Sequence, residues 1–151
     1  MTTNRQYTTR RLSIVNALVD VIKTIDGTGQ WLTDLAGNVK PKMLFWDEVN
    51  EYPAVHIAAG NETREYLPGG HKTRFLSVTI RCYVEGEEPT ELLEYLLGDL
   101  EFVIEENGRL AYQDPSGGIQ TTHDILIASI DTDEGALAPL GVGEIVLQVR
   151  Y

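Results

Sequence analysis

The sequence has one cysteine, Cys82, among 151 residues. One thiol cannot build an internal disulfide framework or a multi-cysteine zinc site, so both are excluded. Cys82 also lies on the apolar side of an alternating strand pattern, where a cysteine usually serves as a small core residue. We therefore predict a structural role for it rather than a catalytic one.

Long hydrophobic runs are missing as well. No apolar stretch approaches the ~20 residues that a membrane helix requires. The N-terminal MTTNRQYTTRR is polar and lacks the apolar segment of a signal peptide. These absences predict a protein that has no membrane partner and is made and kept in the cytoplasm, at least at first.

Basic charge is scarce, because 23 acidic residues outnumber 12 Lys and Arg and give a net charge of −11. Proteins that bind DNA cluster Lys and Arg residues to contact the phosphates, and this sequence shows no such cluster of basic residues. Sequence-specific nucleic-acid binding is therefore not expected. The same acidity suits a surface past which DNA must slide without adhering.

Motifs of catalysis are also absent. His56, His71 and His123 are far apart and lack the spacing of a zinc site. No glycine pair continues into a phosphate-binding loop, and no serine occupies a G-x-S-x-G turn. We predict no catalytic residue, no metal and no cofactor, and a structural role for His56.

What the sequence does contain is two amphipathic helical patterns. Apolar residues recur at helical spacing in 10–25, with Thr8 or Thr9 as the expected cap and Asp26-Gly27 as the end. A leucine-rich stretch at 91–106 shows the same spacing, with Thr90 as its expected cap. Each pattern predicts one helix with a buried face.

Strand patterns surround the second helix. The long run TRFLSVTIRCYV alternates apolar and polar residues, and 61–67 is expected to pair back onto 73–80 as a long antiparallel hairpin. Met43 to Trp46 is expected to form a short strand, and 113–118 a turn. Further strands are predicted at 53–59, 121–131 and 143–151.

The order of these elements predicts an α+β fold. We expect a mainly antiparallel β-sheet, two α-helices packed on one of its faces, and a long projecting β-hairpin. No repeat or linker divides the sequence, so residues 1–151 are expected to form a single domain.

A charge cluster within the predicted hairpin is the main functional candidate: Glu62, Arg64 and Glu65. In an extended strand Glu62 and Arg64 face one side and Glu65 the other, so the two acids do not converge as a catalytic pair. Alternating charges suit an interface, because they set register and reject wrong partners. A solvated hairpin is an equally good interpretation.

In the order of its elements the chain resembles the tail terminator proteins of long-tailed bacteriophages, over roughly residues 10 to 151. The likeness lies in the N-terminal helix, Tyr52 to Val55 entering a strand, Gly60 to Glu65, and Arg81 to Val84 ending a long strand. It continues through the helix at 91–106, Asp131 to Asp133, and the strand from Gly143 to Tyr151.

The resemblance implies a non-enzymatic minor tail protein that acts as a hexameric ring. Such a ring caps the tail tube, ends tube polymerisation at the correct length and presents the surface to which the head connector attaches. DNA then passes through the lumen of the ring. The implied partners are other copies of the chain, the tail tube protein and the head–tail connector protein. The implied locations are the host cytoplasm during assembly and then the virion tail.

Within such a ring, the candidate subunit-interface residues are Arg10, Arg11, Glu62, Arg64 and Glu65. From charge alone we expect the two arginines of one copy to pair with Glu62 and Glu65 of the next. The candidate docking loop toward tube or connector is Pro68, Gly69, Gly70 and His71. The alternatives are another phage neck or head–tail joining protein, a small cytoplasmic enzyme using Glu62, Glu65, His56 or His71, and a binding module.

Overall fold

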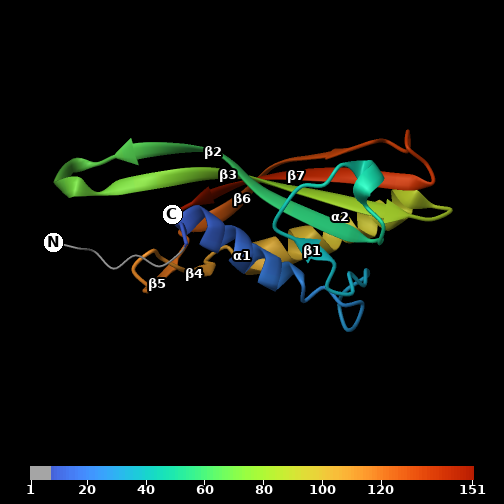
Figure 1. Cartoon of the computed structure of the whole chain (residues 1–151), viewed down its shortest axis with the longest axis horizontal. Helices are drawn as coiled ribbons and strands as arrows, with labels where there is room; N and C mark the ends of the chain where they lie inside the picture. Colours follow the sequence, from blue (N-terminus) through green and yellow to red (C-terminus); the bar gives the residue numbers. More distant parts are fainter. Residues whose placement is uncertain (1–7) are drawn as a thin grey trace.

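A computed structural model describes residues 8–151 and shows two helices packed on one face of a five-stranded sheet (Figure 1). The strand order is β1-β2-β3-β7-β6, and every neighbouring pair is antiparallel except β1 and β2. The strands are β1 (Val39–Lys40), β2 (Ala54–Tyr66), β3 (Lys72–Glu85), β6 (Asp124–Thr132) and β7 (Leu140–Arg150). The predicted α+β fold is confirmed.

Helix α1 (Arg10–Ile22) begins where the sequence predicts, because the Thr9 side chain accepts a hydrogen bond from the backbone N–H of Leu12 at 3.0 Å. It ends three residues before Ile25, with Lys23 as its C-terminal cap, so the predicted end at Asp26-Gly27 is too late. Ile25 remains fully buried beyond the helix, and this burial explains why its spacing resembles a further turn.

Helix α2 (Pro89–Glu106) begins at a proline rather than at a capping threonine. Pro89 lies in the first turn, where a backbone N–H would have no hydrogen-bond partner within the helix, so its absence costs nothing. No side chain caps the N-terminal end of α2. The prediction that Thr90 caps this helix is therefore wrong. The buried face of α2 includes Leu93, Leu96 and Leu100, which pack against the sheet.

The sheet has one face covered by helices and one largely open. Alternate residues of β3, from Leu76 through Cys82, are fully buried beneath the helices. Their neighbours Ser77 and Thr79 lie on the opposite, open face and are half-buried. One end of the open face is covered by Leu44 and Val49, which pack with the strand residues around Tyr83.

Two parts of the predicted strand set need correction. Met43 to Trp46 is not a strand, and a 3₁₀ turn, η1 (Trp46–Glu48), begins at its last residue. The short edge strand β1 precedes this segment. The turn at 113–118 joins two short strands that the sequence did not predict, β4 (Ala111–Gln113) and β5 (Ile119–Thr121).

The β2–β3 hairpin extends beyond the rest of the sheet as a two-stranded ribbon (Figure 1). β7 pairs with β3 from Phe75 onward, and backbone hydrogen bonds between Arg74 and Tyr151 extend this pairing by one residue. Residues 63–66 and 72–73 therefore pair only with each other. The predicted pairing of 61–67 with the start of the long strand is confirmed in outline, from Glu62 opposite Leu76 to Tyr66 opposite Lys72.

Candidate functional site

The candidate interface residues lie at the point where the hairpin leaves the body of the protein. A bulge between Ala59 and Glu62 adds one residue to β2 there. The extra residue changes which side chains face the helices, because side chains along a strand alternate between the two faces. As a result Glu62 and Arg64 point toward α1 and Glu65 points away from it, opposite Thr73.

Glu62 is held by two neighbours. Its carboxylate accepts a hydrogen bond from Arg64 Nε at 2.8 Å and a second one from the hydroxyl of Tyr151. The Glu62 side chain is only 5% exposed, whereas that of Arg64 is 44% exposed. The expectation that Glu62 and Arg64 share one side of the strand is confirmed, and the two residues form an ion pair.

The environment of Glu62 favours its ionised form. Burial raises the pKa of its carboxyl, but the hydrogen bonds from Tyr151 and Arg64 and the charges of Arg64 and Arg11 outweigh burial and lower the pKa overall. Burial, together with the hydrogen bond to Glu62, raises the pKa of the Tyr151 phenol. The pair is therefore a neutral phenol donating to a carboxylate across ordinary pH.

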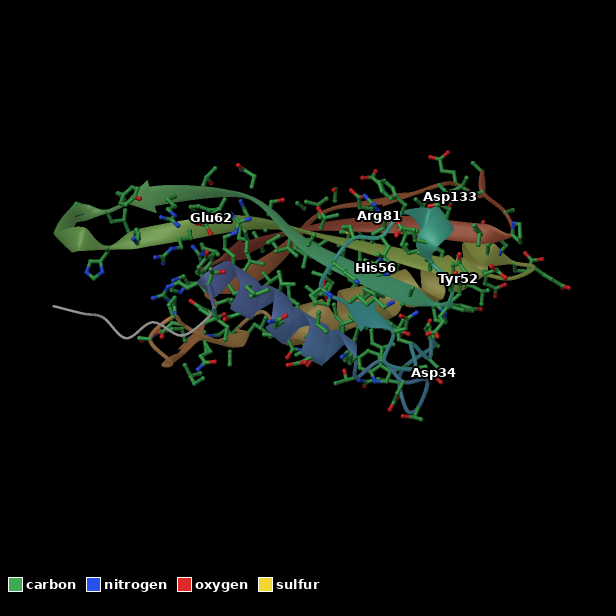
Figure 2. The ribbon with its side chains drawn as sticks, in the orientation of Figure 1. Asp34, Tyr52, His56, Glu62, Arg81 and Asp133 are labelled. Carbon is green, nitrogen blue, oxygen red and sulfur yellow. The ribbon has the colours of Figure 1, made fainter. Side chains whose placement is uncertain are left out.

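Two more arginines hold the ribbon at its base. Arg11 of α1 donates a hydrogen bond to the backbone carbonyl of Gly60. Arg74 exchanges backbone hydrogen bonds of 2.8 and 3.0 Å with Tyr151, and its guanidinium lies 5.3 Å from the centre of the Tyr151 ring. We call Arg11, Glu62, Arg64, Arg74 and Tyr151 the hairpin root (Glu62 is labelled in Figure 2).

The hairpin root brings together only some of the residues that the sequence singled out. Arg11 lies close enough to Glu62 to lower its pKa within one chain, so part of the attraction expected between copies is satisfied internally. Glu65 is exposed, and Arg10 contacts Tyr112 at 3.4 Å. Sequence reasoning missed Tyr151 as a partner, although the strand that it predicted at 143–151 ends at that residue.

The tip of the ribbon is a compact turn, η2 (Pro68–Gly70). The backbone N–H of Leu67 donates to the carbonyl of His71 at 2.8 Å and closes it. Gly69 and Gly70 adopt φ of 84° and 80°, in the left-handed region where a side chain is strained. The candidate docking residues Pro68 to His71 are thus all exposed at the far end of the ribbon.

The tip also exposes apolar surface. Tyr66 is 70% exposed and Leu67 is 45% exposed, and the ammonium of Lys72 lies 6.0 Å from the centre of the Tyr66 ring. An exposed tyrosine and leucine on a protruding turn are a common arrangement in surfaces that contact another protein.

The residues considered for catalysis lie elsewhere. His56 is buried, and burial, followed by the charges of Lys40, Arg81 and Lys42, lowers its pKa. Cys82 is buried, and burial raises the pKa of its thiol to about 12, which leaves it unreactive. Within residues 8–151, no three His, Cys, Asp or Glu side chains are grouped to hold a metal ion.

None of the helices in the described part of the chain is long and apolar enough to cross a membrane.

Comparison with known proteins gives a consistent result. Residues 8–151 match the family described as bacteriophage tail tube terminator protein. The chain is 39% identical over 149 residues to tail tube terminator protein p142 of Escherichia phage T5, covering 93% of this chain and 92% of that protein.

A solved structure shares the fold. A chain from the virion of a native gene transfer agent particle superposes with a TM-score of 0.56 at 9% identity, covering 91% of this chain and 96% of that chain. The fold, the family match over nearly the whole chain and the curated relative agree. The chain belongs to the bacteriophage tail tube terminator family.

Proposed function

We propose that this protein caps the tail tube as a hexameric ring, ends tube polymerisation and forms the surface to which the head connector attaches. Membership of the tail tube terminator family carries the proposal, since that family is structural and the chain is not an enzyme. Residues 1–151 act as one terminator-like domain. The protein assembles in the host cytoplasm and then resides in the virion tail.

The projecting ribbon supports a role in assembly. Two-stranded ribbons are marginal in water by themselves, yet this one is anchored at its root by the partly buried hydrogen bond from Tyr151 to Glu62 and carries an exposed apolar tip. Such an element is expected to gain a partner in the assembled tail. In the proposed ring, the contact between copies includes Arg10, Glu65 and the exposed side of Arg64. Arg11 and Glu62 instead act within one copy, where they fix the angle of the hairpin.

The charge of the protein supports passage of DNA through the ring. A net charge of −11 per copy repels phosphates, so a lumen formed by these subunits lets the genome move without binding it. The proposal therefore includes no sequence-specific contact with nucleic acid.

The length of reconstituted tubes tests this function. The tail tube protein of the same genome is polymerised with and without this protein, and tubes are measured by electron microscopy. We expect shorter tubes that carry sixfold density at one end. Tubes of unchanged length without an end cap contradict the proposal and favour a neck or head–tail joining role.

A further inference from the structure

An apolar groove lies at the end of the molecule opposite the hairpin tip. It has a volume of about 260 Å³ and is formed by the two residues that precede β2, the end of β3, the first turns of α2 and the loop at 32–34. Three of its apolar side chains are substantially exposed: Leu32 at 66%, Leu92 at 38% and Tyr95 at 38%. The carboxylates of Asp34 and Glu85 stand on its rim.

The hairpin tip has the complementary composition. Residues 66–72, from Tyr66 to its cross-strand partner Lys72, carry the basic Lys72 and contain no acidic residue. The same segment exposes Tyr66 and Leu67, which are the only large apolar side chains at the turn. An apolar tip with a basic flank matches an apolar groove with an acidic rim, and such pairing fixes orientation as well as contact.

A chain cannot place its own tip in its own groove. Tyr52 and Pro53 of the groove immediately precede β2, whereas the tip follows the other end of that strand. A strand of 13 residues spans roughly 40 Å at about 3.3 Å per residue. Figures 1 and 2 show the tip at one extreme of the long axis and the labelled Tyr52 and Asp34 toward the other.

We propose that the hairpin tip of one copy inserts into the groove of the next copy, with Tyr66 and Leu67 on Leu32, Leu92 and Tyr95. The contact is heterologous, joining two different patches of the same chain, and such contacts close into rings when the rotation between copies fits. This inference rests on the proposed ring and specifies its interface. A volume of 260 Å³ suits one or two side chains rather than a larger ligand.

Paired cysteines test the contact. Leu67→Cys at the tip is combined with Leu32→Cys in the groove, and native Cys82 is retained because it is fully buried. The double variant is oxidised mildly, both as free protein and mixed with tail tube protein, and analysed on non-reducing gels. We expect covalent multimers from the double variant and none from either single variant.

A matched control uses Leu67→Cys with Ile119→Cys. Ile119 in β5 is 70% exposed, comparable with Leu32, but it lies on the β4–β5 hairpin and not in the groove. It should give no multimers above background. Multimers of equal yield from this control would mean random collision and would overturn the inference.

A charge exchange provides a second test. Lys72→Glu in the cross-linking background should reduce multimer yield several-fold, and adding Glu85→Lys should restore it. Absence of tip-to-groove multimers in both the free and the tube-mixed samples overturns the contact. Tube length, measured with the wild-type protein, reports separately on the capping function, so failure of the tip-to-groove contact is distinguishable from failure of the capping function.

Discussion

Tyr151 links the hairpin to the body of the protein through three kinds of contact. Its hydroxyl donates to Glu62, its backbone pairs with Arg74, and its ring packs edge-on against Tyr112 with centroids 6.0 Å apart. The Glu62 carboxylate is buried, and a buried acceptor that loses its donor bears the cost of desolvation without compensation. The Tyr151 hydroxyl is therefore one of the contacts that hold the ribbon in its direction.

Replacing Tyr151 by Phe tests this contact. We expect a loss of about 1.5–3 kcal/mol in the free energy of unfolding, because a hydrogen bond to a charged, buried group is removed. Chemical denaturation followed by circular dichroism measures the loss.

Tyr112→Phe is the matched control. Tyr112 is buried, and its hydroxyl accepts only a long hydrogen bond of 3.4 Å from Arg10. The Arg10 side chain is half-buried, so water can solvate it when that hydroxyl is removed. The cost of this substitution should stay below about 0.5 kcal/mol. Equal losses in the free energy of unfolding for the two substitutions would show that the hydrogen bond from Tyr151 to Glu62 adds no specific stability.

At the scale of elements, the sequence predicts long regular strands well but predicts very short strands and irregular apolar segments poorly. The alternation in β3 and β7 is long enough to identify both strands and their buried faces. Strands of two or three residues, such as β1 and β4, show no usable period. The apolar run at 43–46 resembles a strand, but Leu44 is half-buried through contacts with Val49 and Tyr83 instead.

The hairpin root shows why the site was only partly predictable. Sequence alone places Glu62 and Arg64 on one side, but the bulge after Ala59 decides that this side faces α1. No local pattern marks the bulge. The bond from Tyr151 to Glu62 joins residues 89 positions apart, so it follows from the sheet topology rather than from spacing.

The exposed face of α2 gives a prediction at this scale. Gly98 lies in the exposed middle of α2, and a methyl group added there meets nothing within 4 Å. Gly98→Ala should raise the free energy of unfolding by about 0.5–1 kcal/mol, because alanine favours the helix more than glycine does. Thermal and urea denaturation measure the gain.

Gly143 of β7 is a position where an added methyl group should destabilise the protein. A methyl group there would lie 3.0 Å from the sulfur of Cys82 and 3.1 Å from Leu93 of α2. Gly143→Ala should therefore cost about 1–3 kcal/mol, as overpacked cores do. If both substitutions stabilised the protein, the packing of α2 on β7 described above would be incorrect.

At the scale of the whole molecule, the protein combines a packed body with a projecting ribbon that consists of two strands only. The body buries both helices against the sheet, whereas the side chains of residues 63–72 are all exposed. Local opening needs little free energy where few buried contacts must break. The two parts should therefore differ in the protection of their backbone amides, and assembly should change only one of them.

Hydrogen exchange measured by mass spectrometry tests this difference. In the free protein, amides of 63–66 and 72–73 should exchange quickly, while those of β7 near Leu147 exchange slowly, because β7 is paired on both sides. In capped tubes the ribbon amides should slow by about tenfold or more, equivalent to about 1.4 kcal/mol of added protection, with β7 unchanged. Ribbon amides that remain equally fast in capped tubes would mean that the hairpin gains no partner. The interface would then have to be formed by the body of the protein.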